Sequence, residues 1–160
     1  MENKDISFLM DNTKYNSRVS AIILSSDAKK ILLHTVNGFD FYLLPGGRIK
    51  LKETGLEAIK RELNEEINLK NIELKERAFI ENIFIFNNTF YHEIQQIFVT
   101  KLNSTNIQIQ NCEEFVSAEN SDLIYKWVNI NDIEKYTLKP FCLKNLIINY
   151  NSPFEYVIEK

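Results

Sequence analysis

The stretch from Gly47 to Leu69 constrains the fold of this chain more than any other part, because it predicts one long amphipathic helix with a marked start. The stretch reads GRIKLKETGLEAIKRELNEEINL. Thr54 is a suitable N-cap residue, and Glu57 stands where a capping box places its glutamate. The sequence therefore predicts a helix over 55–67.

One face of this predicted helix is apolar. At about 100° per residue, a single narrow stripe contains Leu56, Ile59, Leu63 and Ile67. Such a stripe is expected to face the core. Glu62, Glu65 and Glu66 gather on the adjacent flank at the i, i+3 and i+4 positions, where helical side chains are neighbours. Their like charges repel, and the pattern places no basic partner on that flank.

A hard divalent cation would relieve this repulsion. Carboxylate oxygens suit Mg²⁺ or Mn²⁺, and Mg²⁺ commonly shares its coordination with water and substrate phosphates. The competing interpretation is a solvated acidic face, since charge runs on helices usually serve solubility. Solubility does not require Arg61 directly before Glu62, a further Glu53 upstream, or a preceding Leu-Pro-Gly-Gly. These residues favour a metal site.

The lead-in to the helix predicts a strand and a turn. Phe41–Leu44 is a short apolar strand candidate, and Pro45, Gly46 and Gly47 end it with residues that allow a sharp turn and a close backbone approach. Such a turn can present a backbone carbonyl to a metal. Together with the acidic helix, it predicts a strand, loop and helix that form one site.

The rest of the chain reads mainly as strands in a single domain spanning 1–160. A length of 160 residues with 44% hydrophobic content suits one core, and no internal repeats are visible. The predicted strands cover 18–24, 30–35, 72–86, 90–102, 107–109, 123–130 and 154–158. A short helical turn is expected from Asn131, and a helix from Pro140 to about Tyr150.

The stretch from Gly47 to Leu69 resembles the signature of the Nudix hydrolases, GX5EX7REUXEEXGU, in which U is aliphatic. The positions that match it carry Gly47, Glu53, Arg61, Glu62, Glu65 and Glu66. Asn68 replaces the last glycine, at a helix C-cap that usually adopts the left-handed conformation, and asparagine is the next best residue there. The loop also departs from the family, with Lys50, Leu51 and Lys52 instead of an acidic residue, a turn former and a glycine.

The resemblance, which is to MutT-like members, implies the Nudix fold, an α/β/α sandwich with a mixed β-sheet. It implies that Mg²⁺ or Mn²⁺ assists water in hydrolysing a nucleoside diphosphate linked to another group, with a (deoxy)nucleoside triphosphate as the default substrate. It assigns metal binding to Glu62, Glu65 and Glu66, aided by the carbonyl of Gly46 or Gly47. Glu62 is also the first choice as general base, and Arg61 and Glu53 are expected to hold one another and orient the glutamates.

Two questions stay open at this stage. The first is the general base, because some family members use an acid from a later loop. The candidates here are Glu93, Glu113, Glu114, Glu119 and Asp122. The second is the substrate, because the region 84–87 carries no residue typical of a family subclass. Aromatic residues that could stack on a base, or belong to the core, are Phe84, Phe86, Phe90 and Tyr91.

Charge and cysteine content limit the kinds of binding partner and the cellular compartment that we expect. A net charge of −3 provides no electrostatic basis for nucleic-acid binding, whereas a small nucleotide can bind through a metal. Cys112 and Cys142 lack metal-site spacing, and no apolar run resembles a signal peptide or a membrane span. We therefore expect a cytoplasmic protein without membrane partners. A homodimer is compatible with the resemblance.

Two other functions share this fold. One is a non-catalytic Nudix domain that binds a nucleotide-derived ligand, which the complete set of glutamates disfavours. The other is an isopentenyl diphosphate isomerase, which needs a catalytic cysteine in the site. Cys112 and Cys142 lie far from the acidic segment in the sequence, which disfavours this activity.

Overall fold

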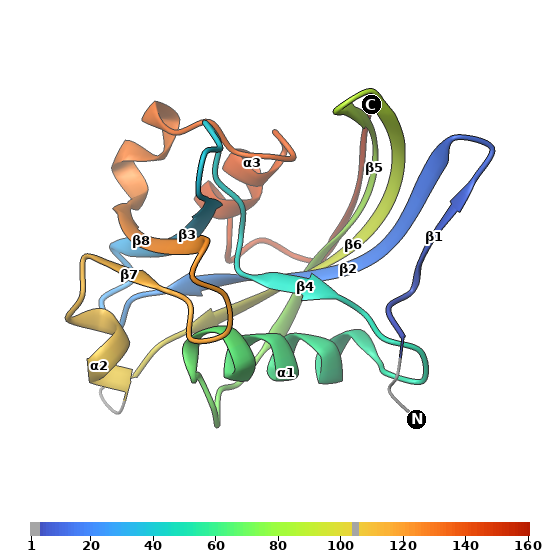
Figure 1. The fold of residues 1–160 in the computed structure, drawn as a ribbon. Helices are drawn as coiled ribbons and strands as arrows, with labels where there is room; N and C mark the ends of the chain where they lie inside the picture. Colours follow the sequence, from blue (N-terminus) through green and yellow to red (C-terminus); the bar gives the residue numbers. More distant parts are fainter. Residues whose placement is uncertain (1–3, 104–105) are drawn as a thin grey trace.

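The computed structural model describes residues 4–103 and 106–160, and a mixed β-sheet lies at its centre (Figure 1). Its long strands are β2 (Thr13–Leu24), β5 (Lys75–Phe86) and β6 (Thr89–Lys101), which are rich in β-branched and aromatic residues. β6 runs parallel to β2 along its whole length and antiparallel to β5. These three neighbouring strands form the main part of the sheet, and the other elements pack around them.

Shorter strands extend the sheet. They are β1 (Ser7–Met10), β3 (Lys30–Val36), β4 (Gly46–Arg48), β7 (Glu114–Val116), β8 (Leu123–Asn129) and β9 (Glu155–Glu159). Among the described residues the strand order is β7-β8-β3-β2-β6-β5-β9, and β1 and β4 also pair with β2. The edge of β2 opposite β6 is therefore shared in turn by β1, β4 and β3.

Helices cover both faces of the sheet. α1 (Gly55–Ile67) packs on one face, and α3 (Leu143–Ile148) with the 3₁₀ helix η2 (Ile130–Lys135) packs on the other (Figure 1). α2 (Ile107–Gln110) is a short helix before β7. The predicted α/β/α sandwich is confirmed. Across residues 4–103 and 106–160, no helix has both the length and the apolar character needed to span a bilayer.

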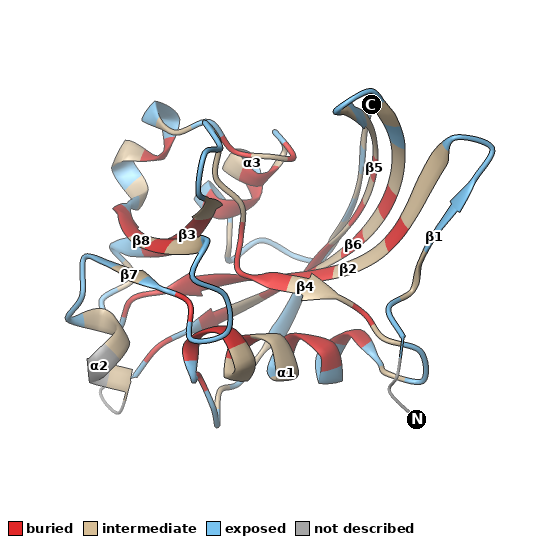
Figure 2. Cartoon of the chain, viewed as in Figure 1, coloured by how far each residue is buried: buried red, intermediate tan, exposed pale blue. Residues whose placement is uncertain are grey.

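Each face of the sheet has its own apolar core, visible as buried segments on both sides of β2 (Figure 2). The core under α1 includes Ile59, Leu63 and Trp127. The core under α3 includes Ile80 and Leu146. Alternate residues of β2 contribute to the two cores, because successive strand residues point to opposite faces.

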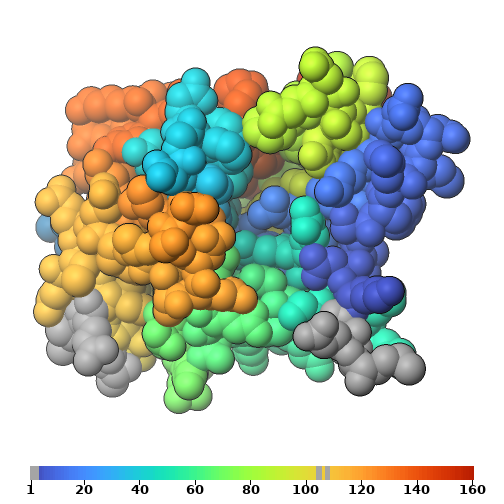
Figure 3. Space-filling model, viewed as in Figure 1, coloured from blue at the N-terminus to red at the C-terminus, as the bar shows by residue number. Residues whose placement is uncertain are grey.

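The sheet curls at one end and leaves a hollow. In the space-filling view the surface is hollowed between the β1–β2 hairpin, the β5–β6 hairpin and the segment that follows β3 (Figure 3). Both hairpins turn on residue pairs with positive φ, Asp11 with Asn12 and Asn87 with Asn88. Asparagine and aspartate tolerate this conformation, which two-residue hairpin turns require.

Three predictions about local structure are wrong. Phe41–Leu44 forms only isolated bridges, while the strand is the Gly46–Arg48 segment expected to be a turn. The glycines permit this, because a Cβ at Gly46 would lie 2.1 Å from the Val19 carbonyl oxygen of β2. The expected strand at 107–109 belongs to α2, and the last helix begins at Leu143 rather than Pro140. Short apolar runs do not distinguish helix from strand.

Candidate functional site

α1 begins and ends where its sequence predicts. The Thr54 hydroxyl accepts a hydrogen bond from the Glu57 backbone N–H (3.3 Å), and the Glu57 carboxylate accepts one from the Thr54 N–H (2.8 Å), which completes the capping box. At the other end Asn68 has φ 53° and ψ 29° in the left-handed region, and its N–H donates to the Asn64 carbonyl. The segment therefore fixes both ends of the helix locally.

The buried face of α1 is rotated from the predicted stripe toward the glutamates. Ile59, Leu63 and Ile67 are buried as expected, and Glu66 is buried with them at 6% exposure. Leu56 is 41% exposed, so its assignment to the core is wrong. The helix packs its glutamate flank toward β4 and β2, which leaves the opposite edge of the stripe in solvent.

Arg61 is the centre of the acidic cluster. Its Nε and Nη2 donate to the two carboxylate oxygens of Glu53 at 2.7 and 2.9 Å. Its Nη1 donates to Glu62 Oε1 at 2.6 Å and to Glu65 Oε2 at 3.1 Å. Nη2 also donates to the Arg48 carbonyl at 3.0 Å, which ties the helix to β4. The structure thus brings Arg61 and Glu53 together as predicted, but the expectation of a flank without a basic partner is wrong.

Gly47 lies directly against the carboxylate of Glu62. A Cβ at this position would lie 2.3 Å from Cδ and 2.5 Å from each carboxylate oxygen. Gly47 pairs with Val19 of β2, so the glycine and its peptide are held in place by the sheet. Glycine is required here for a close approach rather than for an unusual φ. The approach puts the main chain of β4 beside the Glu62 carboxylate.

Glu66 is held by a residue that the sequence does not single out. Tyr125 of β8 donates from its hydroxyl to Glu66 Oε2 at 2.5 Å. The Tyr125 ring is fixed between the Phe115 ring, stacked at 5.4 Å between centroids, and the His34 ring at 5.3 Å. No sequence signal identifies Tyr125, because it lies far from α1 along the chain and reads as an ordinary strand residue.

The electrostatics of the cluster disfavour ionised glutamates at its buried side. Burial, together with the charges of Glu62 and Glu119, raises the pKa of Glu66 to about 7, although the hydrogen bond from Tyr125 opposes this. Burial also raises the pKa of Glu62, although the hydrogen bond from Arg61 opposes this. The pKa of Glu53 is lowered, mainly by its hydrogen bonds from Arg61. Two carboxylates are thus held where their charge is costly without a counter-charge.

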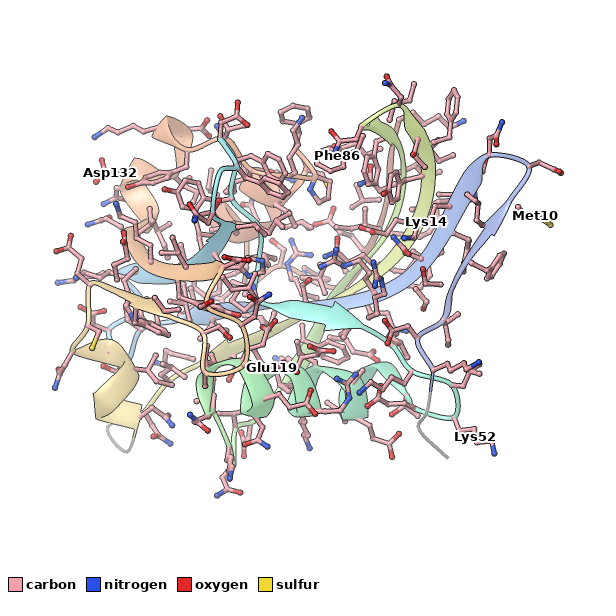
Figure 4. All side chains as sticks on the ribbon, in the orientation of Figure 1. Met10, Lys14, Lys52, Phe86, Glu119 and Asp132 are labelled. Carbon is pink, nitrogen blue, oxygen red and sulfur yellow. The ribbon has the colours of Figure 1, made fainter. Side chains whose placement is uncertain are left out.

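Among the later acids, Glu119 is the one whose charge reaches the cluster. Ser117 donates from its hydroxyl to the Glu66 carbonyl at 3.2 Å, and the Ala118 N–H donates to the same oxygen at 2.8 Å. These bonds dock the segment after β7 on the end of α1. Figure 4 shows Glu119 beside α1. Its negative charge raises the pKa of both Glu62 and Glu66.

The other candidate acids lie elsewhere. Glu113 and Glu114 are exposed at β7, and Asp122 is exposed in the turn before β8. Glu93 is buried on β6, where Asn16 donates to its carboxylate at 3.3 Å. Of the acids in the later loop, the structure therefore brings Glu119 to the glutamate cluster and leaves Glu113, Glu114 and Asp122 in solvent.

The three glutamates do not form a ready metal cage in this arrangement. Among the described residues, no three histidine, cysteine, aspartate or glutamate side chains converge closely enough to hold a metal ion. Arg61 engages oxygens of Glu62 and Glu65, and Tyr125 engages Glu66. The donor set suits a hard cation, because it is anionic, oxygen-based and partly desolvated. The ligand set of Glu62, Glu65, Glu66 and Gly47 remains a prediction.

Neither cysteine suits the isomerase alternative. Cys142 packs against the core under α3, on the face of the sheet opposite α1. Burial raises the pKa of its thiol to about 12, which disfavours a reactive thiolate. Cys112 is exposed between α2 and β7.

Comparison with known proteins supports the same family. The family model described as NUDIX domain matches residues 14–147. The fold is similar to that of MutT from Bacillus halodurans, with a TM-score of 0.67 and 13% identity, covering 90% of this chain and 89% of that one. A comparison with curated proteins gives no match.

Two further solved structures share the fold. The E. coli dihydroneopterin triphosphate pyrophosphohydrolase has a TM-score of 0.64 and 20% identity, covering 86% of this chain and 99% of that one. The NUDIX domain of Shewanella oneidensis NrtR, complexed with ADP ribose, has a TM-score of 0.62 and 16% identity, covering 86% of each chain. Because the family model matches most of a chain whose fold agrees with it, this protein belongs to the Nudix family, whose members act on nucleoside diphosphates linked to another moiety.

Proposed function

We propose that this protein is a divalent-metal-dependent pyrophosphohydrolase that cleaves a nucleoside diphosphate linked to another group, with a (deoxy)nucleoside triphosphate as the first substrate to test. The observation that carries the proposal is the pair of neighbouring carboxylates, buried Glu66 and half-buried Glu62, whose pKa values are both raised and of which Glu62 lies against Gly47. Removing two neighbouring carboxylates from water costs free energy unless a cation or a proton accompanies them.

Glu62, Glu65 and Glu66 would hold Mg²⁺ or Mn²⁺ with the Gly47 carbonyl. When bound, such an ion neutralises phosphate oxygens and lowers the pKa of a coordinated water. Arg61 would release Glu62 and Glu65 while keeping its paired hydrogen bonds to Glu53, so that the Glu53 carboxylate anchors the guanidinium. Tyr125 would keep one oxygen of Glu66 fixed and leave the other for the ion.

Glu62 or Glu119 would take the proton from the attacking water. Glu62 has a raised pKa, which makes it a stronger base than an ordinary carboxylate, and Glu119 stands on an exposed segment docked against α1. In Glu119→Gln a large loss of rate would assign the base to the loop. An unchanged rate would leave the role with Glu62.

The test is hydrolysis of a panel of nucleoside diphosphate derivatives in Mg²⁺ or Mn²⁺. We expect no turnover after exhaustive chelation and full recovery when the metal is restored. Glu62→Gln and Glu66→Gln should each lower the rate by at least about a hundredfold while the fold is retained. Turnover that persists without metal, or near-normal rates in both variants, would refute the proposal.

The alternative is a non-catalytic Nudix domain that binds a nucleotide-derived ligand. The hydrogen bonds from Arg61 to Glu62 and Glu65 favour it, because they occupy oxygens that a metal would need. This alternative predicts saturable binding of a ligand such as ADP ribose, with no hydrolysis of any panel member in the presence of either metal.

We propose the cytoplasm as the location and a small molecule as the partner. Cys142 is a free cysteine, as expected in a reducing compartment. The net charge of −3 supports a nucleotide rather than a nucleic acid as the ligand.

A further inference from the structure

The sheet face opposite α1 carries a row of buried polar side chains that the proposed chemistry does not use. Asn16 on β2, Glu93 on β6 and Asn82 on β5 are register partners across three strands, and each is at most 6% exposed. All three side chains point to the α3 side of the sheet. Side chains alternate between the two faces of a strand, and these residues lie on the same face as Ile22 and Ile80, which belong to the core under α3. They lie past the end of the apolar core, toward the curled part of the sheet.

The neighbouring row contains polar atoms without partners. Arg18 on β2 is the register partner of Gln95 on β6. Gln95 donates from Nε2 to the Ser20 hydroxyl at 2.7 Å, yet its Oε1 and the Nε of Arg18 are buried without a hydrogen bond among the described residues. Buried polar atoms in native proteins are nearly always bonded, so this pair points to a missing partner.

Glu93 adds a second acceptor to this group. The contacts that the structure gives its carboxylate, from Asn16 Nδ2 at 3.3 Å and from Arg18 Nη1 at 3.9 Å, both go to Oε2. The distance to Arg18 is too long for a hydrogen bond. Within the part of the chain that the structure describes, Oε1 accepts no hydrogen bond. Among the described residues, Arg18 Nε therefore lacks an acceptor, and Gln95 Oε1 and Glu93 Oε1 lack donors.

This polar group adjoins the glutamate cluster. Arg18 pairs with Arg48, and Ser20 pairs with Gly46, so β4 carries the chain from the polar rows to Gly47. The charge of Arg18 also lowers the pKa of Glu66, so its electrostatic field reaches that carboxylate. A molecule whose phosphates lie at the glutamates can thus place its opposite end at Arg18, Gln95 and Glu93.

Aromatic rings border the polar group on the side of the hollow. Phe84 and Tyr91, on the same face, stack on each other with centroids 4.9 Å apart. Phe86, at the end of β5, contacts the rings of Phe39 and Phe41 in the segment after β3 (Figure 4). Such a border suits a flat heterocycle whose edge makes hydrogen bonds.

We propose that Arg18, Gln95 and Glu93 recognise the heterocycle of the substrate and select an edge on which a carbonyl, a ring N–H and an amino group follow one another, as in guanine. That edge presents a carbonyl acceptor, a ring N–H donor and an amino donor, which complement one donor and two acceptors in the protein. Adenine offers a donor beside an acceptor, and uracil places acceptors on both sides of its donor. Pterins share the guanine edge. The inference rests on the proposed function for the position of the phosphates.

Binding of nucleoside monophosphates to metal-free protein tests the selection without requiring hydrolysis. GMP should bind at least about tenfold more tightly than AMP, because hydrogen bonds to a buried charged group are strong and unpaired ones are costly. IMP lacks the amino group and should bind more weakly than GMP. Turnover of GTP and of dihydroneopterin triphosphate, compared in Mg²⁺, distinguishes a purine from a pterin as the source of this edge.

Glu93→Gln tests the carboxylate directly. The amide presents one acceptor and one donor, which complements adenine, so GMP should lose affinity and AMP should gain relative to it. His92→Gln is the matched control. His92 neighbours Glu93 on β6 but points to the opposite face, where it contacts Glu81 at 3.1 Å, so the ratio of GMP to AMP affinity should stay unchanged.

The outcomes separate this inference from the proposed function. Equal binding of GMP and AMP, or equal loss of both in Glu93→Gln, overturns the selection even if triphosphates are hydrolysed. A fall in kcat for every substrate with an unchanged preference assigns Glu93 to catalysis and also overturns it. Selective GMP binding without any hydrolysis supports the selection and rejects the proposed function.

Discussion

Gly46 and Gly47 are adjacent glycines that are constrained by different neighbours. A Cβ at Gly46 would meet the backbone of Val19 and Ser20, and its φ of 144° is strained for any other residue. The three atoms nearest to a Cβ at Gly47 would all belong to the carboxylate of Glu62, the far end of a side chain. Gly46 is therefore needed for the close pairing of β4 with β2, and Gly47 is needed for the position of the Glu62 carboxylate.

Alanine substitutions should separate these two roles. Gly46→Ala should lower the free energy of unfolding by about 2 kcal/mol or more, because the strand cannot move away from β2. Gly47→Ala should change stability by less than about 1 kcal/mol but reduce the rate at least about tenfold, because Glu62 must move. Denaturant unfolding and hydrolysis rates of both variants check this. Equal losses of stability in the two variants would contradict it.

Glu66 should make the stability of the metal-free protein depend on pH. Its pKa is about 7 in the folded chain and about 4.5 when unfolded, so only the unfolded chain releases this proton as the pH rises between these values. Folding therefore weakens with rising pH across this window, by about 3 kcal/mol once both states are ionised. Glu53 acts in the opposite direction and at lower pH, because its folded pKa is lowered.

The measurement is the unfolding free energy of metal-free protein at pH 5 and pH 8. Wild type should be less stable at pH 8 from this contribution, and Glu66→Gln should reduce the difference, since the amide does not titrate. The raised pKa of Glu62 adds a change of the same sign that persists in Glu66→Gln. An identical pH dependence in wild type and Glu66→Gln would show that Glu66 does not titrate with the expected shift.

At the scale of elements, α1 is a locally specified helix whose position depends on three distant attachments. Its caps lie within the segment itself. Arg61 fastens it to the Arg48 carbonyl of β4, Tyr125 fastens it to β8, and Ala118 fastens its last turn to the segment after β7. Movement of any of these elements would change the spacing of the glutamates.

The C-cap of α1 gives a prediction at this scale. Asn68 occupies the left-handed region, so Asn68→Gly should be neutral or stabilising by a few tenths to about 1 kcal/mol. Asn68→Val should be destabilising, because a β-branched side chain is strained at positive φ. Thermal unfolding of the two variants measures this. A valine variant as stable as wild type would contradict the cap.

The loop before α1 has a lysine, rather than a glycine, in the left-handed conformation at its turn. Lys52 has φ 66°, in the left-handed region, at the position where related proteins commonly have glycine. The Lys50 N–H donates to Glu53 Oε2 at 2.9 Å, which closes the loop on the carboxylate that Arg61 also holds. The loop therefore holds Glu53 in place for Arg61 despite its departure from the family pattern.

At the scale of the whole molecule, two cores share one sheet, so we expect them to unfold together as a single domain. β2 contributes alternate residues to both cores and pairs with β1, β3, β4 and β6. Loss of either core would expose one face of the same strand. Residues 1–160 should therefore form one cooperative unit.

Unfolding followed by two probes tests this expectation. Trp127 is the only tryptophan in the sequence and is buried under α1, where its Nε1 donates to the Ile109 carbonyl. Its fluorescence reports one core, whereas far-ultraviolet circular dichroism reports every helix and strand. The two transitions should coincide in denaturant midpoint. Separate midpoints would indicate that the faces of the sheet unfold independently.

The sequence by itself determined α1 and its two caps, because capping and helical periodicity act between residues a few positions apart, and its resemblance to the Nudix signature implied the pairing of Arg61 with Glu53. Only the tertiary structure decided which glutamates are buried, how closely Gly47 approaches Glu62, and that Tyr125 and Glu119 meet the cluster rather than Glu113 or Glu114. The same holds for the polar row around Glu93. These features depend on strand register and on contacts between segments far apart in the chain, and no local pattern encodes the electrostatic cost of burial that results.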